Sequence, residues 1–393
     1  MPPSGSSAPA PTGLVAPGFE PLAELFARSL GRGGGALALR RGEHVLVDLC
    51  GGWADRGQTR PWTPDTACLG FSVAKGMAST VLHRLADRGL LDYDAPVAAY
   101  WPEFASAGKE RVTVRQLLSH RAGLWDLRPL VREPDDWLDH LLMEERLASA
   151  ARATRQDVPG YHAIAFGWLA AGLARRATGL GMRQLVREEI AEPLGVSGLH
   201  IGRPPADVPI AEIVGSMPKL GGALVKAEPF WSKSPYVPGF LAALYAPGVD
   251  RHIVSGRILD TEMPSSNGVV TASALCAMYA ALANDGGLGG RRLLSPQTAR
   301  ALREVQTAQR DRVILGAKMR WRLGYHQASG VPSRSDGAFG HDGIGGSTGW
   351  ADQDTGLSFA LVWNDVGDRA STTLRTARGF QLSASAWKLA QDR

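Results

Sequence analysis

The pattern of hydrophobic and polar positions divides the chain into strand-like ends and a helical middle. Near the N-terminus, "GALALRRGEHVLVDLCGG" contains two apolar runs separated by Arg41-Gly42, which predicts a β-hairpin. Near the C-terminus, strands are predicted in "MRWRLGYHQA", "GAFGHDGIGGSTGWADQ" and "GLSFALVWND". We therefore expect an α/β (α+β) fold, in which an antiparallel sheet built from both chain ends is flanked by helices and carries an inserted, mostly helical domain.

Helical periodicity is clearest after residue 71. Val73, Met77, Val81 and Leu85 recur at helical spacing from residue 72 to about 88, and Gly89 is suited to end that helix. Further helices are predicted over residues 19–30, 113–124, 136–153, 162–179, 182–195, 271–287 and 371–392.

These elements predict how the chain is organised. Residues 1–17, which begin "MPPSGSSAPAPTG", are expected to form a disordered lead. Residues 18–91 and 263–393 are expected to form the sheet domain, and residues 92–262 the inserted helical domain. Within that insertion, residues 203–262 are rich in proline and aromatic side chains and are expected to form a lid-like excursion or pocket wall.

Composition narrows the class of protein. The chain has 393 residues, of which 44% are hydrophobic and 21% charged, as is typical of soluble globular proteins of more than one packed unit. The net charge is only +5 and arginine is scattered, so neither a nucleic-acid partner nor a membrane partner is expected. Apolar stretches such as "LAALYA" are far shorter than the ~20 residues that a membrane span needs.

The cysteines indicate a reducing compartment. Cys50, Cys68 and Cys276 lack metal-ligand spacing and cannot all pair. The N-terminus has neither the basic nor the apolar segment of a signal peptide, so a cytoplasmic location is expected. No H-E-x-x-H or C-x-x-C pattern occurs, and we expect no metal and no cofactor. The sequence indicates no particular oligomeric state.

The candidate chemistry begins at Ser72-Val-Ala-Lys75, because a serine three residues before a lysine opens the predicted helix. The same spacing recurs at Ser106/Lys109, Ser216/Lys219 and Ser385/Lys388, in a glycine-containing connection, before a proline and inside the terminal helix. Only Ser72 begins a helix directly after an apolar, strand-like segment.

At this position the two side chains lie on one helix face and can touch. Burial and the positive end of the helix dipole both lower a lysine pKa, so that a neutral amine can take the serine proton. The alternative is that Ser72 is a helix cap and Lys75 is solvated.

Two further features bear on that choice. Tyr161 is predicted to open an apolar helix and can relay a proton beside a lysine; alternatively it is an ordinary core tyrosine. In "FGHDGIGGSTGW", glycines let a strand approach a ligand, His341 is a donor on that strand, and the Ile344 N–H is suited to hold an oxyanion. The alternative for this segment is a glycine-rich hairpin with a surface histidine.

Together, Ser72-Val-Ala-Lys75, Tyr161-His-Ala163 and His341-Asp-Gly343 resemble the three ordered motifs of the class C β-lactamase-like serine hydrolases, which include family VIII carboxylesterases, penicillin-binding peptidases and some acyltransferases. The resemblance extends from about residue 20 to the end of the chain. It implies a β-lactamase/transpeptidase-like fold with the site between a sheet domain and a helical domain.

The resemblance also implies roles for individual residues. Ser72 matches the acylated serine, Lys75 its partner and Tyr161 the tyrosine of the second motif. The backbone N–H groups of Ser72 and Ile344 match the oxyanion pair, and His341 replaces the lysine of the third motif, beside Gly343.

Two departures from the family pattern change the expected substrate and site. Position 163 is alanine instead of an asparagine that would bind a substrate amide, which favours esters over β-lactams or peptides. Pro159-Gly160 directly abuts Tyr161, whereas relatives separate them by several residues.

The sequence thus predicts a serine carboxylesterase that acts on a small-molecule ester or acyl substrate through an acyl-enzyme. Its alternatives are an acyltransferase of biosynthetic metabolism, a β-lactamase or D-amino peptidase, and a non-catalytic binding protein. Aromatic residues are expected to form an apolar substrate wall: Trp125, Phe230, Trp231, Tyr236 and Phe240.

Other motifs are assigned no catalytic role. His120 is expected to be structural, and His162 is at most expected to support the site. Asn267 is expected to cap the following helix, with a place at the border of the cleft as the alternative. Gly345-Gly-Ser-Thr-Gly349 matches G-x-S-x-G but precedes a strand-like segment, whereas a nucleophile elbow precedes a helix.

Overall fold

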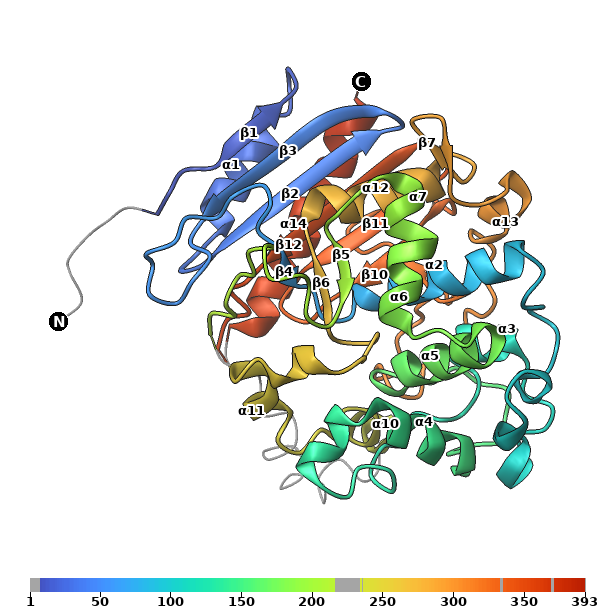
Figure 1. Cartoon of the computed structure of the whole chain (residues 1–393). Coiled ribbons are helices and arrows are strands. Elements are labelled where there is room, and N and C mark those ends of the chain that lie inside the picture. The colour runs from blue at the N-terminus through green and yellow to red at the C-terminus, as the bar shows by residue number, and fades with distance from the viewer. Residues whose placement is uncertain (1–7, 216–233, 235, 333–334, 369–370, 393) are drawn as a thin grey trace.

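The computed structural model describes residues 8–215, 234, 236–332, 335–368 and 371–392 (Figure 1). The strands are β1 (Thr12–Val15), β2 (Gly34–Arg41), β3 (His44–Gly52), β4 (Cys68–Leu69), β5 (Leu199–Ile201), β6 (Gly268–Val270), β7 (Gly287–Leu288), β8 (Arg291–Arg292), β9 (His326–Gln327), β10 (Ala338–Asp342), β11 (Thr348–Asp352) and β12 (Leu357–Trp363). The helices are α1 (Glu20–Ser29), α2 (Ala74–Asp87), α3 (Val114–Leu118), α4 (His140–Ser149), α5 (Ala165–Thr178), α6 (Met182–Val186), α7 (Glu192–Leu194), α10 (Val237–Ala243), α11 (Val249–Val254), α12 (Ala272–Ala283), α13 (Pro296–Ala301) and α14 (Thr372–Gln391).

The main sheet joins both ends of the chain, which confirms the expected fold class. Its strand order is β1-β3-β2-β12-β11-β10-β9, and its neighbouring strands are antiparallel. The N-terminal hairpin β2-β3 pairs with the C-terminal strand β12 along its whole length, from Gly35 opposite Trp363 to Arg41 opposite Leu357. In Figure 1 the blue N-terminal strands therefore lie beside the red C-terminal ones.

Alternating side chains explain why both faces of this sheet are covered by helices. On β2, Leu37 and Leu39 join the apolar cluster that contains α1 and α14, whereas Ala36 and Ala38 join the cluster that contains α12. This follows from the two-residue period of a strand. The small alanines leave room for α12 on one face, and the leucines fill the space under α1 and α14 on the other.

The N-terminal lead differs from the expectation of disorder. Within the described part of residues 1–17, Thr12–Val15 form β1, which pairs with β3 from Thr12 opposite Cys50 to Val15 opposite Val47. The predicted lead was wrong here because β3 would otherwise be an edge strand, whose backbone N–H and C=O groups pair with any extended segment of suitable length.

The central region is helical but less regular than its periodicity predicts. The helix expected over 136–153 is shorter, with α4 spanning His140–Ser149 after a 3-10 turn at Pro134–Leu138. β5 lies inside the predicted helical insertion and pairs with β6, which also pairs with β4 in a small three-stranded sheet. The domain boundaries at residues 92 and 262 therefore stay predictions. Of the lid-like excursion, residues 216–233 and 235 lie outside the described residues.

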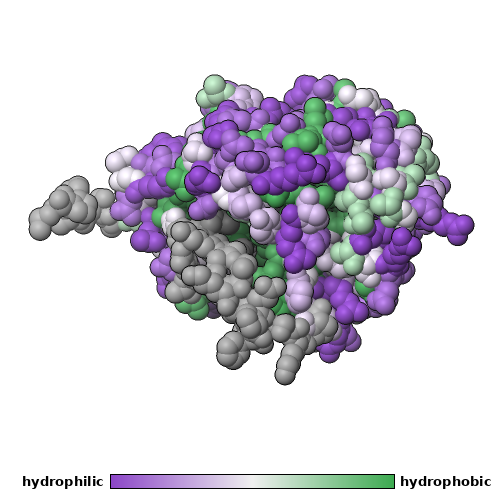
Figure 2. Space-filling model, turned by 90° about the horizontal axis from the view of Figure 1, so that it is seen from below, coloured by the Kyte–Doolittle hydropathy of each residue, from purple (hydrophilic) through white to green (hydrophobic). Residues whose placement is uncertain are grey.

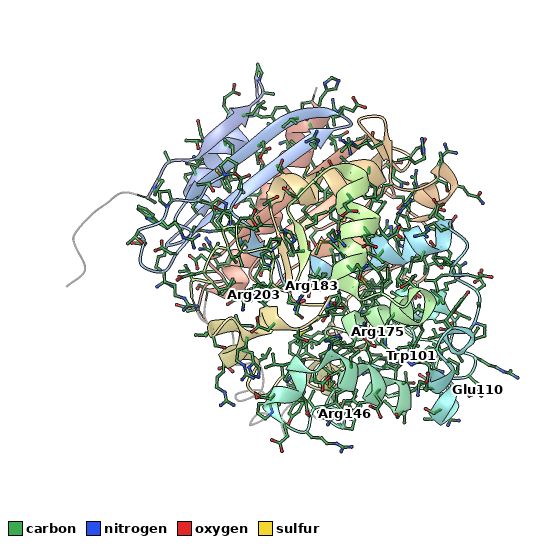
Figure 3. The ribbon with its side chains drawn as sticks, in the orientation of Figure 1. Trp101, Glu110, Arg146, Arg175, Arg183 and Arg203 are labelled. Atoms are coloured by element: carbon green, nitrogen blue, oxygen red, sulfur yellow. The ribbon has the colours of Figure 1, made fainter. Side chains whose placement is uncertain are left out.

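Ion pairs connect helices of this region, and two of the arginines involved, Arg146 and Arg175, are labelled in the lower half of Figure 3. The Arg175 guanidinium of α5 lies 3.2 Å from the Glu144 carboxylate of α4 and 3.6 Å from that of Glu262. Arg146 pairs with Asp136 at the start of the same helical layer. Glu144 is almost fully buried. Its substitution is therefore expected to lower the free energy of unfolding more than substitution of a residue in an exposed ion pair would.

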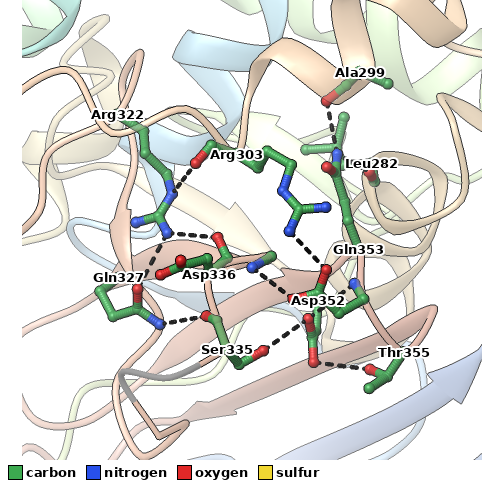
Figure 4. A network of polar contacts seen from close by, with 12 residues as sticks. Leu282, Ala299, Arg303, Arg322, Gln327, Ser335, Asp336, Asp352, Gln353 and Thr355 are labelled. Carbon is green, nitrogen blue, oxygen red and sulfur yellow. Dashed lines mark hydrogen bonds and ion pairs between the residues drawn. The ribbon is translucent and has the colours of Figure 1, made fainter.

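The segment predicted as the strand "MRWRLGYHQA" is mostly irregular, and only His326–Gln327 form β9. Its conformation is fixed by Arg322, which is fully buried and donates to the carbonyls of Arg303, Arg320 and Asp336 and to the Gln327 side chain (Figure 4). Burial lowers the pKa of Arg322 to about 10. The strand prediction was wrong because a buried guanidinium takes carbonyl groups that a β-ladder would otherwise use.

The outer surface mixes polar and apolar residues. Seen from below, hydrophilic side chains predominate, with hydrophobic residues gathered near the centre of that face (Figure 2). Among the described helices, we find none with the length and apolar character needed to cross a bilayer. A search of the same residues finds no group of three or more metal-ligating side chains.

Candidate active site

Ser72 lies in the turn between β4 and α2, and its hydroxyl contacts Lys75. The Lys75 Nζ lies 2.8 Å from Ser72 Oγ and donates to the Ser265 carbonyl, also at 2.8 Å. α2 begins at Ala74 with no side-chain cap, so Ser72 is not the cap of this helix. Phe71 has a φ of 53° directly before Ser72, a strained conformation that re-aims the chain between strand and helix.

The electrostatics at Lys75 favour a neutral amine. The side chain is fully buried, and burial holds its pKa well below the ordinary 10.5. Its two polar contacts are a hydroxyl and a carbonyl, neither of which is charged. A neutral amine has a lone pair and can accept the Ser72 proton, which an ammonium group cannot.

Tyr161, in the segment that precedes α5, lies near the same hydroxyl. Its phenol lies close enough to the Ser72 side chain for that side chain to lower the Tyr161 pKa, and Lys75 Nζ lies 5.1 Å from the centre of the Tyr161 ring. Burial raises the pKa of Tyr161, so the phenol stays protonated. Contrary to the sequence prediction, Tyr161 does not open a helix: α5 begins four residues later, at Ala165.

Two backbone N–H groups, those of Ser72 and Ile344, were expected to hold an oxyanion. In the described part of the chain, neither the Ser72 N–H nor the Ile344 N–H donates to a protein acceptor, whereas the neighbouring Gly343 N–H donates to the Ser347 carbonyl at 2.7 Å. Ile344 lies in the turn between β10 and β11. A pair of free N–H groups at the nucleophile is the arrangement that stabilises an oxyanion.

Gly343 lets the turn that carries Ile344 lie close to the backbone just before Ser72. A Cβ at this position would lie 2.2 Å from the Gly70 carbonyl oxygen. Because this oxygen belongs to the backbone, the clash cannot be removed by rotating a side chain. We expect Gly343→Ala to push the Ile344 turn away from Ser72 and to lower kcat/KM for esters by about 10²-fold, the effect of losing one oxyanion donor. Steady-state kinetics check this, with Gly287→Ala as the control, because a Cβ there meets only ordinary contacts at 3.4 Å. Equal kinetics for the two variants would contradict the expectation.

His341 lies on β10 beside Tyr161, with ring centres 6.0 Å apart. It is 2% exposed, so the alternative of a surface histidine is wrong, although the segment is a glycine-rich hairpin. Burial holds its pKa well below 6.5. Its Nδ1 contacts the Asp342 carbonyl at 3.1 Å, and its buried Nε2 has no protein partner among the described residues.

The predicted aromatic wall is only partly assembled near the site. Trp125 packs against Gly160, where a Cβ would lie 2.4 Å from its ring, and it shares an apolar cluster with Tyr161. It also lines a cavity of about 450 Å³. Tyr236 is half-buried and packs on Gly316. Phe230 and Trp231 lie outside the described residues, and the substrate-binding role of the wall stays a prediction.

Two histidines that were assigned no catalytic role are buried behind Tyr161. The His120 ring lies 5.1 Å from the Tyr161 ring, and its Nδ1 accepts from the His162 N–H at 3.2 Å. His162 Nε2 accepts from the Leu124 N–H at 2.9 Å, and burial lowers the His162 pKa to about 3. Both rings are therefore neutral at physiological pH and serve as packing and hydrogen-bonding groups.

Asn267 was predicted to cap a helix, which is wrong. Thr271 is the cap of α12, and its Oγ1 accepts from the Ala274 N–H. Asn267 is fully buried and donates to the carbonyls of Ile258 and Thr261, at 2.9 and 2.8 Å. It thus shapes the loop that leads to Ser265, whose carbonyl binds Lys75, a contact for which the sequence carries no motif.

The other S-x-x-K pairs do not reproduce the geometry at Ser72. Lys109 donates to the backbone carbonyl of Ser106 at 2.8 Å, while the Ser106 hydroxyl donates elsewhere, to Ala148. The other two pairs are Ser385/Lys388, in α14, and Ser216/Lys219, which lies outside the described residues. The G-x-S-x-G match falls in the hairpin turn before β11, not before a helix.

Comparisons with known proteins identify relatives of this chain in sequence and in fold. A sequence model of the family described as "Beta-lactamase" matches residues 21–382. The chain is 45% identical over 367 residues to the "Esterase/beta-lactamase LipL" of Mycobacterium tuberculosis, covering 90% of this chain and 82% of that protein. Among solved structures, a family VIII carboxylesterase superposes with a TM-score of 0.82 at 34% identity, covering 96% of this chain and 99% of that one. A penicillin-binding protein homologue from Caulobacter crescentus superposes with a TM-score of 0.80 at 34% identity, with the same coverage of both chains.

Proposed function

The chain belongs to the beta-lactamase family, and from this premise we propose that it is a serine hydrolase that cleaves carboxylic esters through an acyl-enzyme. The observation that carries the proposal is the buried amine of Lys75, 2.8 Å from the Ser72 hydroxyl, with its pKa held low by burial. The relative named as an esterase and the carboxylesterase structure support the same chemistry.

In the proposed reaction, Ser72 Oγ attacks the ester carbonyl carbon while its proton passes to Lys75 Nζ. The carbonyl oxygen becomes an oxyanion, which the N–H groups of Ser72 and Ile344 stabilise, each donor contributing about 3–4 kcal/mol in comparable sites. The carbon–oxygen bond to the alcohol then breaks. Tyr161 donates its proton to the departing oxygen and recovers one from the Lys75 ammonium.

Hydrolysis of the acyl-enzyme reverses these proton transfers. Water loses a proton to Lys75 as its oxygen attacks the acyl carbon, and Ser72 Oγ recovers a proton as it leaves. His341 is proposed to contact the substrate, since its buried Nε2 has no protein partner among the described residues and lies on the strand beside Tyr161.

We propose that esters are preferred over β-lactams because position 163 offers no side-chain amide. Ala163 is 4% exposed and packs with Trp125 and Val313 in an apolar cluster. An ester without the acylamino side chain of a β-lactam leaves no N–H donor unpaired at this apolar wall, whereas an unpaired buried donor costs about 1–3 kcal/mol.

A fluorophosphonate probe tests the proposal. We expect it to form one covalent adduct, found on Ser72 by intact-mass and peptide mass spectrometry, because only Ser72 has a neutral amine at its hydroxyl among the described serines. Ser106→Ala is the matched control, since Ser106 has the same spacing to a lysine, and its labelling is expected to equal that of the unaltered protein. Labelling of another serine, or none, would overturn the proposal.

The same site accommodates acyl transfer if an alcohol replaces water as the acceptor. Product analysis with and without an added acceptor alcohol separates the two outcomes, because hydrolysis releases the acid and transfer releases a new ester. We also propose a cytoplasmic location, which the three buried, free thiols of Cys50, Cys68 and Cys276 support.

A further inference from the structure

A buried carboxylate lies behind Tyr161. Asp311 is 0% exposed, and its Oδ1 accepts the backbone N–H of Tyr161 at 3.1 Å and those of Val313 and Ile314 at 2.7 and 2.9 Å. Its Oδ2 accepts the indole N–H of Trp321 at 2.8 Å. All four donors are neutral, so this carboxylate is held by oriented N–H groups and not by an ion pair.

These contacts hold Tyr161 from two sides. The Tyr161 N–H fixes the backbone, and the Trp321 ring stacks on the Tyr161 ring with centres 5.3 Å apart and an interplanar angle of 18°. One carboxylate therefore fixes both the main chain of Tyr161 and the aromatic surface against which its ring rests.

The local backbone gives Tyr161 little other support. It precedes the first residue of α5, Ala165, by four positions and so lies outside the helix. The shortened Pro159-Gly160 approach is held by two backbone bonds: Arg312 N–H to the Pro159 carbonyl, and Gly160 N–H to the His120 carbonyl, both at 2.9 Å. The loop that begins at Asp311 thus supports the short segment before Tyr161.

From this arrangement we propose that Asp311 is a positioning residue, which holds the Tyr161 hydroxyl at Ser72 so that it can protonate the leaving alcohol. This inference rests on the proposed esterase reaction. Burial raises the Tyr161 pKa, and the negative charges of Asp342 and then of Asp311 raise it further, which keeps the phenol protonated and able to donate.

The nature of the leaving group separates positioning from general stability. An alkyl alcohol must be protonated as it leaves, whereas nitrophenolate leaves as a stable anion. A misplaced Tyr161 therefore slows acylation by an alkyl ester much more than acylation by a nitrophenyl ester. The ratio of kcat/KM for ethyl acetate and p-nitrophenyl acetate reports this difference, because the two esters share one acyl group.

Two variants and one matched control form the test. Asp311→Ala removes all four hydrogen bonds, and Asp311→Asn keeps an oxygen for the backbone donors but not for Trp321. Asp352 is the control: it is also 0% exposed and accepts an indole N–H, from Trp387 at 3.1 Å, at the far end of β11 (Figure 4). Thermal unfolding of all three variants measures the purely structural cost.

We expect Asp311→Ala to lower kcat/KM for ethyl acetate by about 10²-fold, as for a displaced catalytic group, and that for p-nitrophenyl acetate by less than about tenfold. Asp311→Asn is expected to shift the ratio in the same direction by a smaller factor, and it alone decides the test if the alanine variant does not fold. Asp352→Asn is expected to leave the ratio unchanged.

An unchanged ratio in the folded Asp311 variants, or an equal shift in Asp352→Asn, would overturn the proposal. Failure of the esterase reaction itself is distinguishable, because it would show as ester turnover that survives Ser72→Ala. If Ser72→Ala abolishes turnover of both esters while the Asp311 variants keep the ratio, only the positioning role is excluded.

Discussion

Ser72→Ala is expected to lower ester turnover by about 10⁴-fold or more while the fold persists, because no acyl-enzyme can form without the nucleophile. The variant keeps Lys75, Tyr161 and both free N–H groups, so any residual rate measures what these groups contribute to direct attack by water. Turnover of p-nitrophenyl acetate and intact mass after a pulse of substrate provide the two measurements.

The structural cost of this substitution is expected to be small. Ser72 is half-buried and does not cap α2, so the free energy of unfolding is expected to change by about 1 kcal/mol or less. Ser106→Ala is the matched control, because its hydroxyl bonds a backbone carbonyl far from Lys75 in the chain. A Ser72→Ala variant with unchanged turnover would exclude the acyl-enzyme mechanism altogether.

Lys75→Met is expected to lower kcat/KM by about 10²–10⁴-fold, the usual contribution of a general base. In the unaltered enzyme, activity is expected to fall as pH decreases through the lowered pKa of Lys75, because the amine becomes an ammonium and no longer accepts the Ser72 proton. Tyr161 does not account for this limb of the profile, since burial raises its pKa. A pH profile of kcat/KM checks both statements, and a pH-dependent limb that persists in Lys75→Met would contradict them.

The same lowered pKa predicts how stability depends on pH. At pH values between the folded-state pKa of Lys75 and its unfolded value of 10.5, Lys75 is protonated in the unfolded chain but neutral in the folded one. The free energy of unfolding therefore falls as pH decreases through this window. Lys75→Met removes the linkage. We therefore expect the stability of the variant relative to the unaltered protein to increase as pH falls through the window, measured by denaturant unfolding at several pH values. A constant difference across the window would contradict a buried, neutral lysine.

The local sequence was sufficient for the strands β2, β3, β10, β11 and β12 of the main sheet and for the helix after Ser72. Leu37 and Leu39 alternate with smaller residues at the two-residue period of a strand, and the apolar run "LSFALVW" indicates a second, buried strand. The apolar face of such a strand must be buried, which restricts how it can pair. Helical spacing and Gly89 located α2 and its end. Both features are local, so they can be recognised without knowledge of distant residues.

Elements that depend on distant partners were not recognisable in this way. β1 exists because β3 offers an unpaired edge, and the segment around Trp321 is irregular because Arg322 binds carbonyls from other segments. Asn267 likewise bonds a loop that precedes it instead of the helix that follows it. In each case a side chain or strand edge satisfies backbone groups whose identity the local pattern does not specify.

The sequence by itself placed Ser72 and Lys75 three residues apart at the start of a helix, within reach of each other, and it marked Tyr161 and His341 as residues of interest. Only the tertiary structure decided that the amine is buried, that Tyr161 lies near the Ser72 side chain, and that the Ser265 carbonyl binds the amine while Asp311 binds the Tyr161 backbone. The physical reason is that pKa values and hydrogen bonds depend on what surrounds a group in space, and that surrounding comes from segments up to 190 residues away in the chain.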